Sequence, residues 1–446
     1  MTETAGAGPA APALRPLERA LRVFADVRAG EGVTVLLMCL NVFLLLAAYY
    51  ILKTAREPLI LLAGGAELKS YAAAAQALAL VAYVPLYGWV AQRLPRTKFL
   101  AAVLLFFVGC IQLFFFGSRA GLPHLGIVFF VWLGIFSLTT ISQFWSYANE
   151  VYSRPEGERL FPLIAIGSTA GAPLGAALAE RLFARGMSPF FMMQIAAAIL
   201  VVHLLLYRVI GRRIAAVAGR PAAEPIKGGN GFALVLQSPY LRAIALLLVM
   251  LNIVNTVGEF ILARALMGQA EARAAEAGFD QAAYIGQFYG RYFLLTNLAA
   301  IALQAFVVSR VVRRFGLGGA VLALPLVALG VYGTAASGAG LAILLYLKVA
   351  ENSTDYSLMN TAKQMIWLPT SREEKYKAKQ AIDTFFVRAG DLLAAGVVFV
   401  GTNLIPRGVA GFARLNVVLV LVAMVAAWLL LREYRRLTAP GEAAAA

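Results

Sequence analysis

The first apolar run of the chain carries cations at a spacing that could bind an anion. Tyr49, Lys53 and Arg56 recur at helical spacing and share one face, with Glu57 beside them. Two cations one turn apart repel each other unless an anion lies between them, so this pair predicts a clamp for a multiply charged anion. Pro58 follows the stripe directly, and we expect it to loosen the end of the helix.

Charged and amide side chains also interrupt several later apolar runs. A charge deep in a membrane span costs at least ~2.5–3.5 kcal/mol unless it faces a wet cavity or a partner. These positions are therefore candidates for a site or for buried ion pairs. They are Glu150, Asn252, Asn255, Glu259, Arg291, Lys348, Glu351, Asn352, Asp355, Lys363, Asp383, Arg388 and Asp391. For Lys348 with Glu351, and for Arg388 with Asp391, the spacing fits an ion pair that only stabilises the bundle as well as it fits a site.

The composition predicts a membrane protein. The 446 residues are 61% hydrophobic and only 14% charged, which gives far more apolar surface than a soluble core of this length needs. Lys and Arg outnumber Asp and Glu by 39 to 23, an excess that membrane proteins place in cytoplasmic loops, so we expect no nucleic-acid partner. The cysteines and histidines are isolated from one another, and we expect no disulfide, metal site or cofactor.

Twelve apolar runs are long enough to cross a bilayer as helices, which takes about 20 residues each. Runs of this length exclude a β-barrel. The predicted fold is therefore an all-α membrane protein with about twelve transmembrane helices in two six-helix halves, like the major facilitators. The predicted spans are 33–62, 71–92, 99–117, 126–151, 160–182, 189–210, 241–266, 284–309, 317–337, 340–367, 378–403 and 409–431.

The distribution of basic residues orients the chain. With both termini in the cytoplasm, 25 of the 39 basic residues lie in cytoplasmic segments and eight in outside segments. Basic turns at 92–98 and 309–316 occupy the same place in the two halves, which indicates a duplicated six-helix unit. The predicted parts are a cytosolic segment 1–32, a bundle 33–210, a linker 211–240, a second bundle 241–431 and a cytosolic tail 432–446.

Glycines and nucleotide motifs exclude some functions. Gly167, Gly171 and Gly175 form two overlapping G-x-x-x-G motifs, which predict close helix packing and not nucleotide binding. The chain has no P-loop, no G-x-S-x-G and no H-E-x-x-H sequence. We therefore expect neither an enzyme nor an ATP-driven pump, and any energy for transport must come from solute gradients.

Three blocks of sequence together resemble a known family. They are 50–59 at the end of the first span, 144–150 with 158–163 around the fourth and fifth, and 363–369 followed by Lys375, Lys377, Lys379 and Asp383. These blocks are similar to those of the ATP/ADP translocases of plastids and obligate intracellular bacteria, which are related to the major facilitators. The resemblance implies substrate-binding charges at Arg56, Glu150, Glu259 and Lys379. The first of these is usually lysine in the family, and arginine also binds phosphate, with bidentate geometry.

The sequence thus predicts a secondary active transporter that exchanges ATP/ADP-like nucleotides or related phosphorylated anions by alternating access. Lys53 and Arg56 would clamp the phosphates, while Lys363 and Lys379 would assist from the other half. Glu150 would help to balance charge or couple to protons. Glu259 would share that role, and the coupling or gating positions would be Arg291, Glu351, Asp355 and Asp383.

The exchange mode follows from the same charges. An empty site lined by Lys53, Arg56 and Lys379 would hold cations without counter-ions, which slows its empty return unless Glu150 or Glu259 pairs with the clamp. Two alternatives stay open: a proton-coupled carrier of another solute, and a membrane scaffold or sensor that transports nothing. We expect a monomer in the inner membrane of a bacterium.

Overall fold

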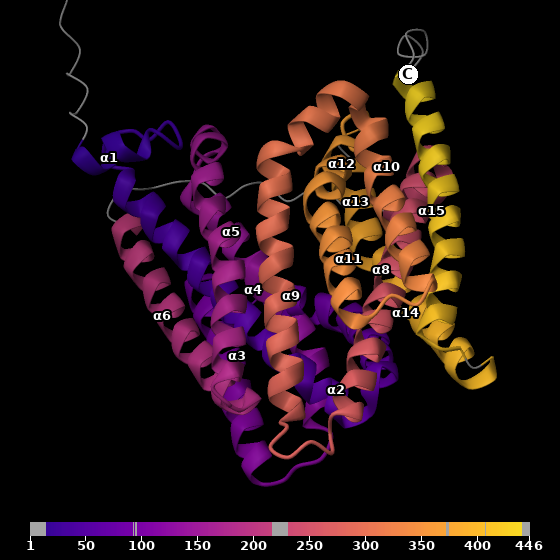
Figure 1. Cartoon of the computed structure of the whole chain (residues 1–446). Coiled ribbons are helices and arrows are strands. Elements are labelled where there is room, and N and C mark those ends of the chain that lie inside the picture. The colour runs from indigo at the N-terminus through magenta and orange to yellow at the C-terminus, as the bar shows by residue number, and fades with distance from the viewer. Residues whose placement is uncertain are drawn as a thin grey trace, which may run out of the picture.

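The computed structural model describes residues 15–91, 93, 96–215, 231–371, 374–405 and 407–438, and these residues form helices and no strands (Figure 1). The N-terminal half, as used below, comprises α1 (Pro16–Leu21), α2 (Gly32–Ala91), α3 (Arg96–Arg119), α4 (Leu125–Val151), α5 (Arg154–Ala184) and α6 (Pro189–Ala215). The C-terminal half begins with α7 (Gly231–Gln237), α8 (Pro239–Ala272), α9 (Gln281–Phe306), α10 (Val308–Ala336) and α11 (Leu341–Thr354). It continues with short π-helical and α-helical segments: η1 (Asp355–Met359), α12 (Asn360–Met365), η2 (Glu374–Ala378), α13 (Lys379–Ala381), η3 (Ile382–Phe386), α14 (Val387–Phe399), η4 (Val400–Leu404) and α15 (Val409–Thr438).

The all-α membrane architecture is confirmed, and the described helices fit twelve crossings. Nine of them are long and apolar enough to cross a membrane. One of the nine, α2, contains the first two predicted spans, and it bends between them at Gly64 and Gly65. Helix α9 and the segment from α11 to α12 occupy two further predicted spans at 284–309 and 340–367. The predicted linker at 211–240 includes residues 216–230, which lie outside the described residues, so the domain boundaries stay a prediction.

The expected loosening at Pro58 is wrong. Helix α2 continues through this proline and breaks six residues later, where Gly65 has a φ of 70° that side-chain-bearing residues rarely adopt. Proline is tolerated inside membrane helices when neighbouring helices hold the backbone in place. Here α4 lies directly against the α2 backbone, since a Cβ added at Gly126 would fall 2.2 Å from the carbonyl oxygen of Leu59.

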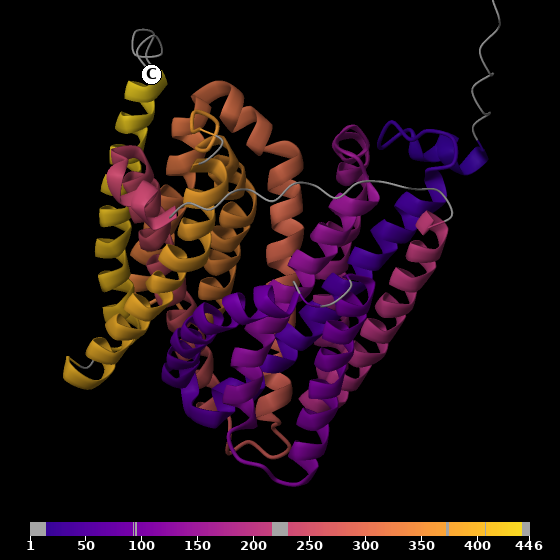
Figure 2. The ribbon, with the colours of Figure 1, turned by 180° about the vertical axis from the view of Figure 1, so that it is seen from behind.

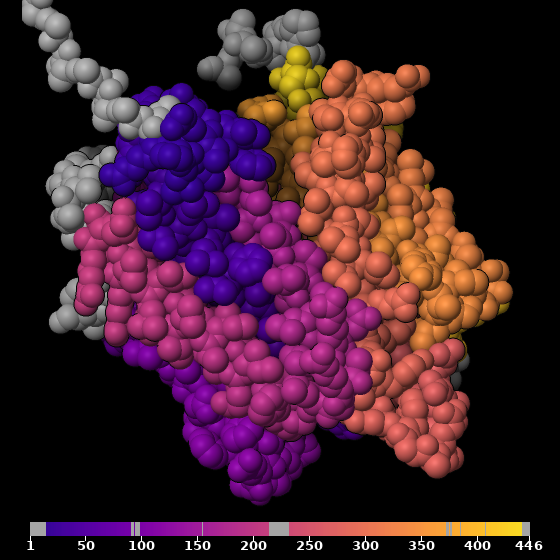
Figure 3. All heavy atoms as spheres, turned by 60° about the vertical axis from the view of Figure 1, so that its left-hand side comes forward, coloured from indigo at the N-terminus to yellow at the C-terminus, as the bar shows by residue number. Residues whose placement is uncertain are grey.

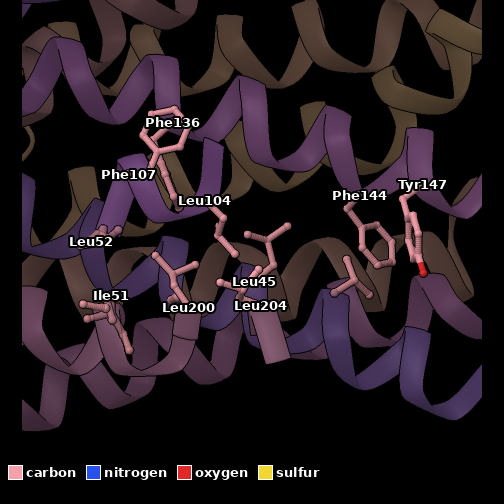
Figure 4. Close-up of a cluster of buried hydrophobic side chains, with 14 of the residues drawn as sticks. Leu45, Ile51, Leu52, Leu104, Phe107, Phe136, Phe144, Tyr147, Leu200 and Leu204 are labelled. Carbon is pink, nitrogen blue, oxygen red and sulfur yellow. The ribbon is translucent and has the colours of Figure 1, made fainter. Parts of the chain in front are cut away.

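The N-terminal half is held together by a tight apolar core. Side chains from α2, α3, α4 and α6 interlock in its centre (Figure 4), and among those labelled are Leu45, Leu104, Phe107, Phe136 and Leu200. The outside of the molecule is also apolar, since Leu113 of α3 is 72% exposed and Trp428 of α15 is 55% exposed. An apolar exterior around an apolar core is what a lipid-facing bundle requires.

The paired G-x-x-x-G motif brings α5 onto the backbone of α2, as the sequence predicted. Three glycines at four-residue spacing leave room for the carbonyl oxygens of α2. From Gly167, Gly171 and Gly175 in turn, an added Cβ would lie 2.1 Å from the carbonyl oxygen of Cys39, 2.4 Å from that of Phe43 and 2.4 Å from that of Ala47.

The two halves touch at one end of the molecule and separate toward the other. Helix α2 packs on α8, α9 and α14, and α5 packs on α9. The hydroxyl of Tyr50 donates to the Asn297 side chain (3.2 Å) across this boundary. Helix α1 and the last turns of α15 both lie at the opposite end, on opposite sides of the molecule (Figures 1 and 2), and the surface between the halves is recessed there (Figure 3).

Candidate functional site

A polar cavity of about 300 Å³ lies between the two halves; we call it the central cavity. Helices α2 and α4 line it from the N-terminal half, and α8, α9, α11, η1 and α14 line it from the C-terminal half. Its wall consists of Lys53, Arg56, Lys69, Ser70, Ala73, Gln76, Phe130, Asn252, Asn255, Thr256, Glu259, Phe260, Phe293, Asn352, Tyr356, Arg388 and Asp391. Three of the six predicted substrate-binding residues, Lys53, Arg56 and Glu259, therefore share one wall.

A second cavity of about 330 Å³ lies within the C-terminal half; we call it the C-terminal cavity. It shares Asn252, Asn255 and Asn352 with the central cavity, so the two are adjacent compartments. The other predicted residues in its wall are Lys363, Lys379, Glu351, Asp355 and Asp383. Two of them, Asp355 and Asp383, lie in the π-helical segments η1 and η3, a backbone form that is frequent at functional sites.

Lys53 is the cation best placed to bind a ligand in the central cavity. Its ammonium lies 4.3 Å from the ring centre of Phe293 and 5.1 Å from that of Tyr50. These rings stabilise the charge through cation–π contacts but do not neutralise it. Among the described residues, no carboxylate oxygen comes within 4.0 Å of this ammonium. Lys53 can therefore give its charge to an anion in the cavity.

Arg56 has a different environment, because it already has a carboxylate partner. Its guanidinium forms an ion pair with the fully buried side chain of Glu57 and stacks 4.2 Å from the ring centre of Phe130. The other carboxylate oxygen of Glu57 lies 2.7 Å from the ammonium of Lys69. Glu57 therefore lies between two cations, and one buried acid compensates part of the charge of both.

Lys69 also links the two halves. Its ammonium donates to the hydroxyl of Tyr289 (3.0 Å) and lies 3.7 Å from the carboxylate of Glu259, both in the C-terminal half. The Glu259 carboxylate accepts hydrogen bonds from the hydroxyl of Tyr292 (2.7 Å) and the amide of Asn352 (3.1 Å). Glu259 is thus a junction where the N-terminal half, α9 and α11 meet.

The two pairs at i, i+3 spacing both form ion pairs, and whether they also serve a site stays a prediction. Lys348 and Glu351 are 2.9 Å apart and almost fully buried, and the hydroxyl of Tyr332 donates to the same carboxylate (2.6 Å). Arg388 and Asp391 are 3.2 Å apart in α14. Arg388 and Asp391 also line the central cavity, so the pairing does not exclude contact with a ligand.

The two lysines expected to assist from the C-terminal half do not lie with Lys53. Lys363 pairs with Asp355 at 3.1 Å, and Lys379 donates to the side-chain oxygen of Gln364 at 3.0 Å. Both lysines face the C-terminal cavity. A joint phosphate clamp with Lys53 would need these side chains to move.

Glu150 and Arg291 lie away from both cavities. Glu150 is exposed near the end of α4, and Arg291 is exposed on α9. Their position within an apolar run fixed their depth in a span but not the face of the helix on which they lie. The structure puts both on a face that lines neither cavity.

Lys69 is the site residue that the sequence reasoning missed. It falls between the predicted spans 33–62 and 71–92, so it reads as part of an outside loop. In the structure α2 continues through this segment after its bend, and Lys69 is only 8% exposed. Lys69, Ala73 and Gln76 share one helical face and line the same cavity, but the alanine between the two polar residues leaves no polar stripe that the sequence could have signalled.

Comparison with known proteins now places the chain. A family model described as the TLC ATP/ADP transporter matches residues 127–337 and 331–434, more than half of the sequence. The chain belongs to this family. The resemblance seen in the sequence is thereby confirmed, and the members of the family that match are carriers.

Two curated relatives are both named ADP,ATP carrier protein 1. The protein of Chlamydia trachomatis is 22% identical over 318 residues, which are 61% of this chain and 58% of that carrier. The protein of Chlamydia muridarum is 22% identical over 302 residues, which are 58% of this chain and 55% of that carrier. The matched region thus spans less than two thirds of either relative.

Solved transporter structures share the fold over almost the whole chain. A nucleoside transporter, NupG, has a TM-score of 0.67 at 11% identity and covers 90% of this chain and 99% of its own. A POT family transporter bound to 5-aminolevulinic acid has a TM-score of 0.64 at 13% identity, covering 91% and 96%. These likenesses confirm the predicted major-facilitator-like architecture.

Proposed function

We propose that this family member is a secondary active transporter that exchanges nucleotides, or related phosphorylated anions, by alternating access. The observation that carries the proposal is the central cavity, where Lys53 is held between two aromatic rings with Arg56 one turn away. The family of ATP/ADP transporters supplies the substrate class. In this proposal the chain carries its substrate unchanged and performs no catalysis.

The proposed roles follow the two cavities. Lys53 binds the phosphate directly, and Arg56 offers its remaining N–H groups, since guanidinium groups bind phosphate in bidentate fashion. Glu259 connects the substrate-binding wall to the contact between the halves. Lys363 and Lys379 serve the C-terminal cavity, where the nucleoside end or a leaving substrate would pass. Glu150 and Arg291 would act from outside the cavities, if they contribute to transport.

The arrangement of the halves suggests which side is open. The positive-inside distribution predicts that both termini are cytoplasmic, and α1 and the last turns of α15 lie at the end where the halves are separated (Figure 1). The conformation described would then open its cavities to the cytoplasm, and the Lys69 contacts to Tyr289 and Glu259 would help to close the outer side. Closure of one side while the other opens is the basis of alternating access. We place the protein in the inner membrane of a bacterium, as a monomer.

Thermal stabilisation by ligands tests the substrate class. A ligand that binds only the folded state raises the unfolding temperature, so nucleotides and sugar phosphates should stabilise the detergent-purified full chain. The Lys53→Gln variant should lose this stabilisation, while Arg273→Gln, which removes an exposed cation outside both cavities, should keep it. If no phosphorylated compound stabilises the wild-type protein, the proposal is overturned.

A further inference from the structure

The charges around the cavities nearly cancel. The wall of the central cavity carries four cations, Lys53, Arg56, Lys69 and Arg388, but only two carboxylates, Glu259 and Asp391. Glu57 adds a third carboxylate directly behind this wall, in contact with two of those cations. The local sum is therefore a single positive charge.

The C-terminal cavity does not change this sum. Its lysines, Lys363 and Lys379, are matched in number by Asp355 and Asp383 in the same wall. The remaining acid of that wall, Glu351, is paired with Lys348 at 2.9 Å. A substrate that occupies the central cavity, or both cavities, therefore meets a lining with a net positive charge of one, whereas the C-terminal cavity alone is neutral.

Among the described residues, one cation of the central cavity has no carboxylate partner. Each cation of the central cavity other than Lys53 has a carboxylate oxygen within 4.0 Å, supplied by Glu57, Glu259 or Asp391. Lys53, and the cations that already share a carboxylate, can offset part of the negative charge of a substrate. Each negative charge beyond that part must be held without a counter-ion. In a cavity shielded from water such a charge is far more costly than in solution.

From this charge count, and resting on the proposed function, we infer that the carrier selects phosphorylated substrates of low net charge, with Glu57 as the residue that sets the limit. The chemical class is a nucleotide with a single phosphate, or a longer nucleotide whose charge is reduced by a bound divalent cation. At neutral pH a phosphomonoester carries about two negative charges, and each further phosphate adds about one. A metal-free nucleoside triphosphate would exceed the positive charge of the lining by about three.

The affinities of AMP, ADP and ATP for the full-length wild-type protein in detergent, with EDTA present, test this inference. We expect AMP to bind more than tenfold tighter than ATP, with ADP between them. Addition of Mg²⁺ should bring ATP to within a few-fold of AMP, because the bound cation lowers the charge and not the size. ATP binding in EDTA at least as tightly as AMP would overturn the inference, and so would a preference for AMP that Mg²⁺ leaves unchanged.

The Glu57→Gln variant tests the residue. It removes one buried negative charge at nearly constant volume, so ATP affinity in EDTA should rise at least tenfold relative to AMP affinity. The matched control is Glu271→Gln, an exposed acid on α8 outside both cavities, which should keep the wild-type order. An unchanged AMP-to-ATP ratio in folded Glu57→Gln would overturn the role of Glu57.

The wild-type series keeps the inference testable if Glu57→Gln does not fold. The same series distinguishes failure of the charge limit from failure of the proposed transport. Binding of nucleotides without the predicted order of charge would refute the charge limit and leave the proposed transport intact. If none of the three nucleotides binds but another phosphorylated compound stabilises the protein, the inference fails and the proposed function stands. If no phosphorylated compound binds, the proposed function fails as well.

Discussion

At the scale of single residues, the site depends on which cations are compensated. The sequence identified Lys53 and Arg56 as a pair on one helical face, and both line the central cavity. It did not reveal that Arg56 pairs with its neighbour Glu57, or that Lys53 has no carboxylate partner among the described residues. The contact of Glu57 with Lys69 also depends on the bend of α2 between them. Helical spacing defines a face of a helix, but pairing between distant positions depends on the bend.

Arg56→Gln tests the phosphate-binding role of the second cation. The substitution removes a bidentate donor and also leaves Glu57 with only Lys69 as a partner. Nucleotide affinity should therefore fall more than tenfold, that is by over ~1.4 kcal/mol. Equilibrium binding to purified protein measures the effect. Arg264→Gln is the control, because this arginine pairs with Glu67 at 3.5 Å and lines neither cavity. Loss of folded Arg56→Gln protein, with normal affinity in the remainder, would indicate a purely structural ion pair.

At the scale of helices, hydropathy located the spans, but local geometry came from contacts. The predicted span at 126–151 differs from α4 (Leu125–Val151) by one residue. Pro58 was expected to loosen the end of the first span, but α2 continues through it and bends at Gly64 and Gly65, because packing against α4 supports the helix around the proline. Sequence patterns report which residues prefer lipid, whereas a bend also depends on which neighbour lies alongside.

Gly171→Ala tests the close packing of α5 on α2. The added methyl group would lie 2.4 Å from the carbonyl oxygen of Phe43, so the helices must separate. Overpacking of this kind typically destabilises a protein by about 1–3 kcal/mol. We expect a lower unfolding temperature in detergent and a lower membrane yield. Gly109→Ala on α3, where an added Cβ has no atom within 4 Å, should behave like wild type. Equal stability of the two variants would contradict the packing role.

At the scale of the whole molecule, the account requires a defined orientation in the membrane. The orientation is predicted from the asymmetry of basic residues and not from the family. Helix α1 and the last turns of α15 lie at the same end of the molecule, which agrees with both termini on one side of the membrane. Charge patterns can orient a chain, but they cannot tell which side of the bundle is open. That information came only from the packing between the halves.

Cysteine labelling in cells tests the orientation. After replacement of Cys39 and Cys110, a single cysteine at Ser371 should react with a membrane-impermeant reagent only from the cytoplasm. A single cysteine at Gly278, in the loop between α8 and α9, should react only from outside. The opposite pattern at either position would reverse the proposed topology, and with it the side to which the cavities open.

The central claim is that one cavity carries a phosphorylated anion and exchanges it for another, and counterflow measures this directly. In the empty state Glu57 already compensates Arg56, so Lys53 is the cation of the central cavity that has no carboxylate partner in the described part of the chain and that closure without substrate leaves uncompensated. A cation and an anion about 4 Å apart attract by ~4 kcal/mol at an effective dielectric of about 20. If about a third of this attraction, ~1.4 kcal/mol, is lost in the empty carrier, its return slows about tenfold.

Purified protein in liposomes should therefore take up labelled AMP about tenfold faster when unlabelled AMP is present inside. In the Lys53→Gln variant both rates should fall toward those of protein-free liposomes. Equal initial rates with and without internal nucleotide would contradict exchange. Uptake that depends on external acid pH and not on internal nucleotide would instead support a proton-coupled carrier.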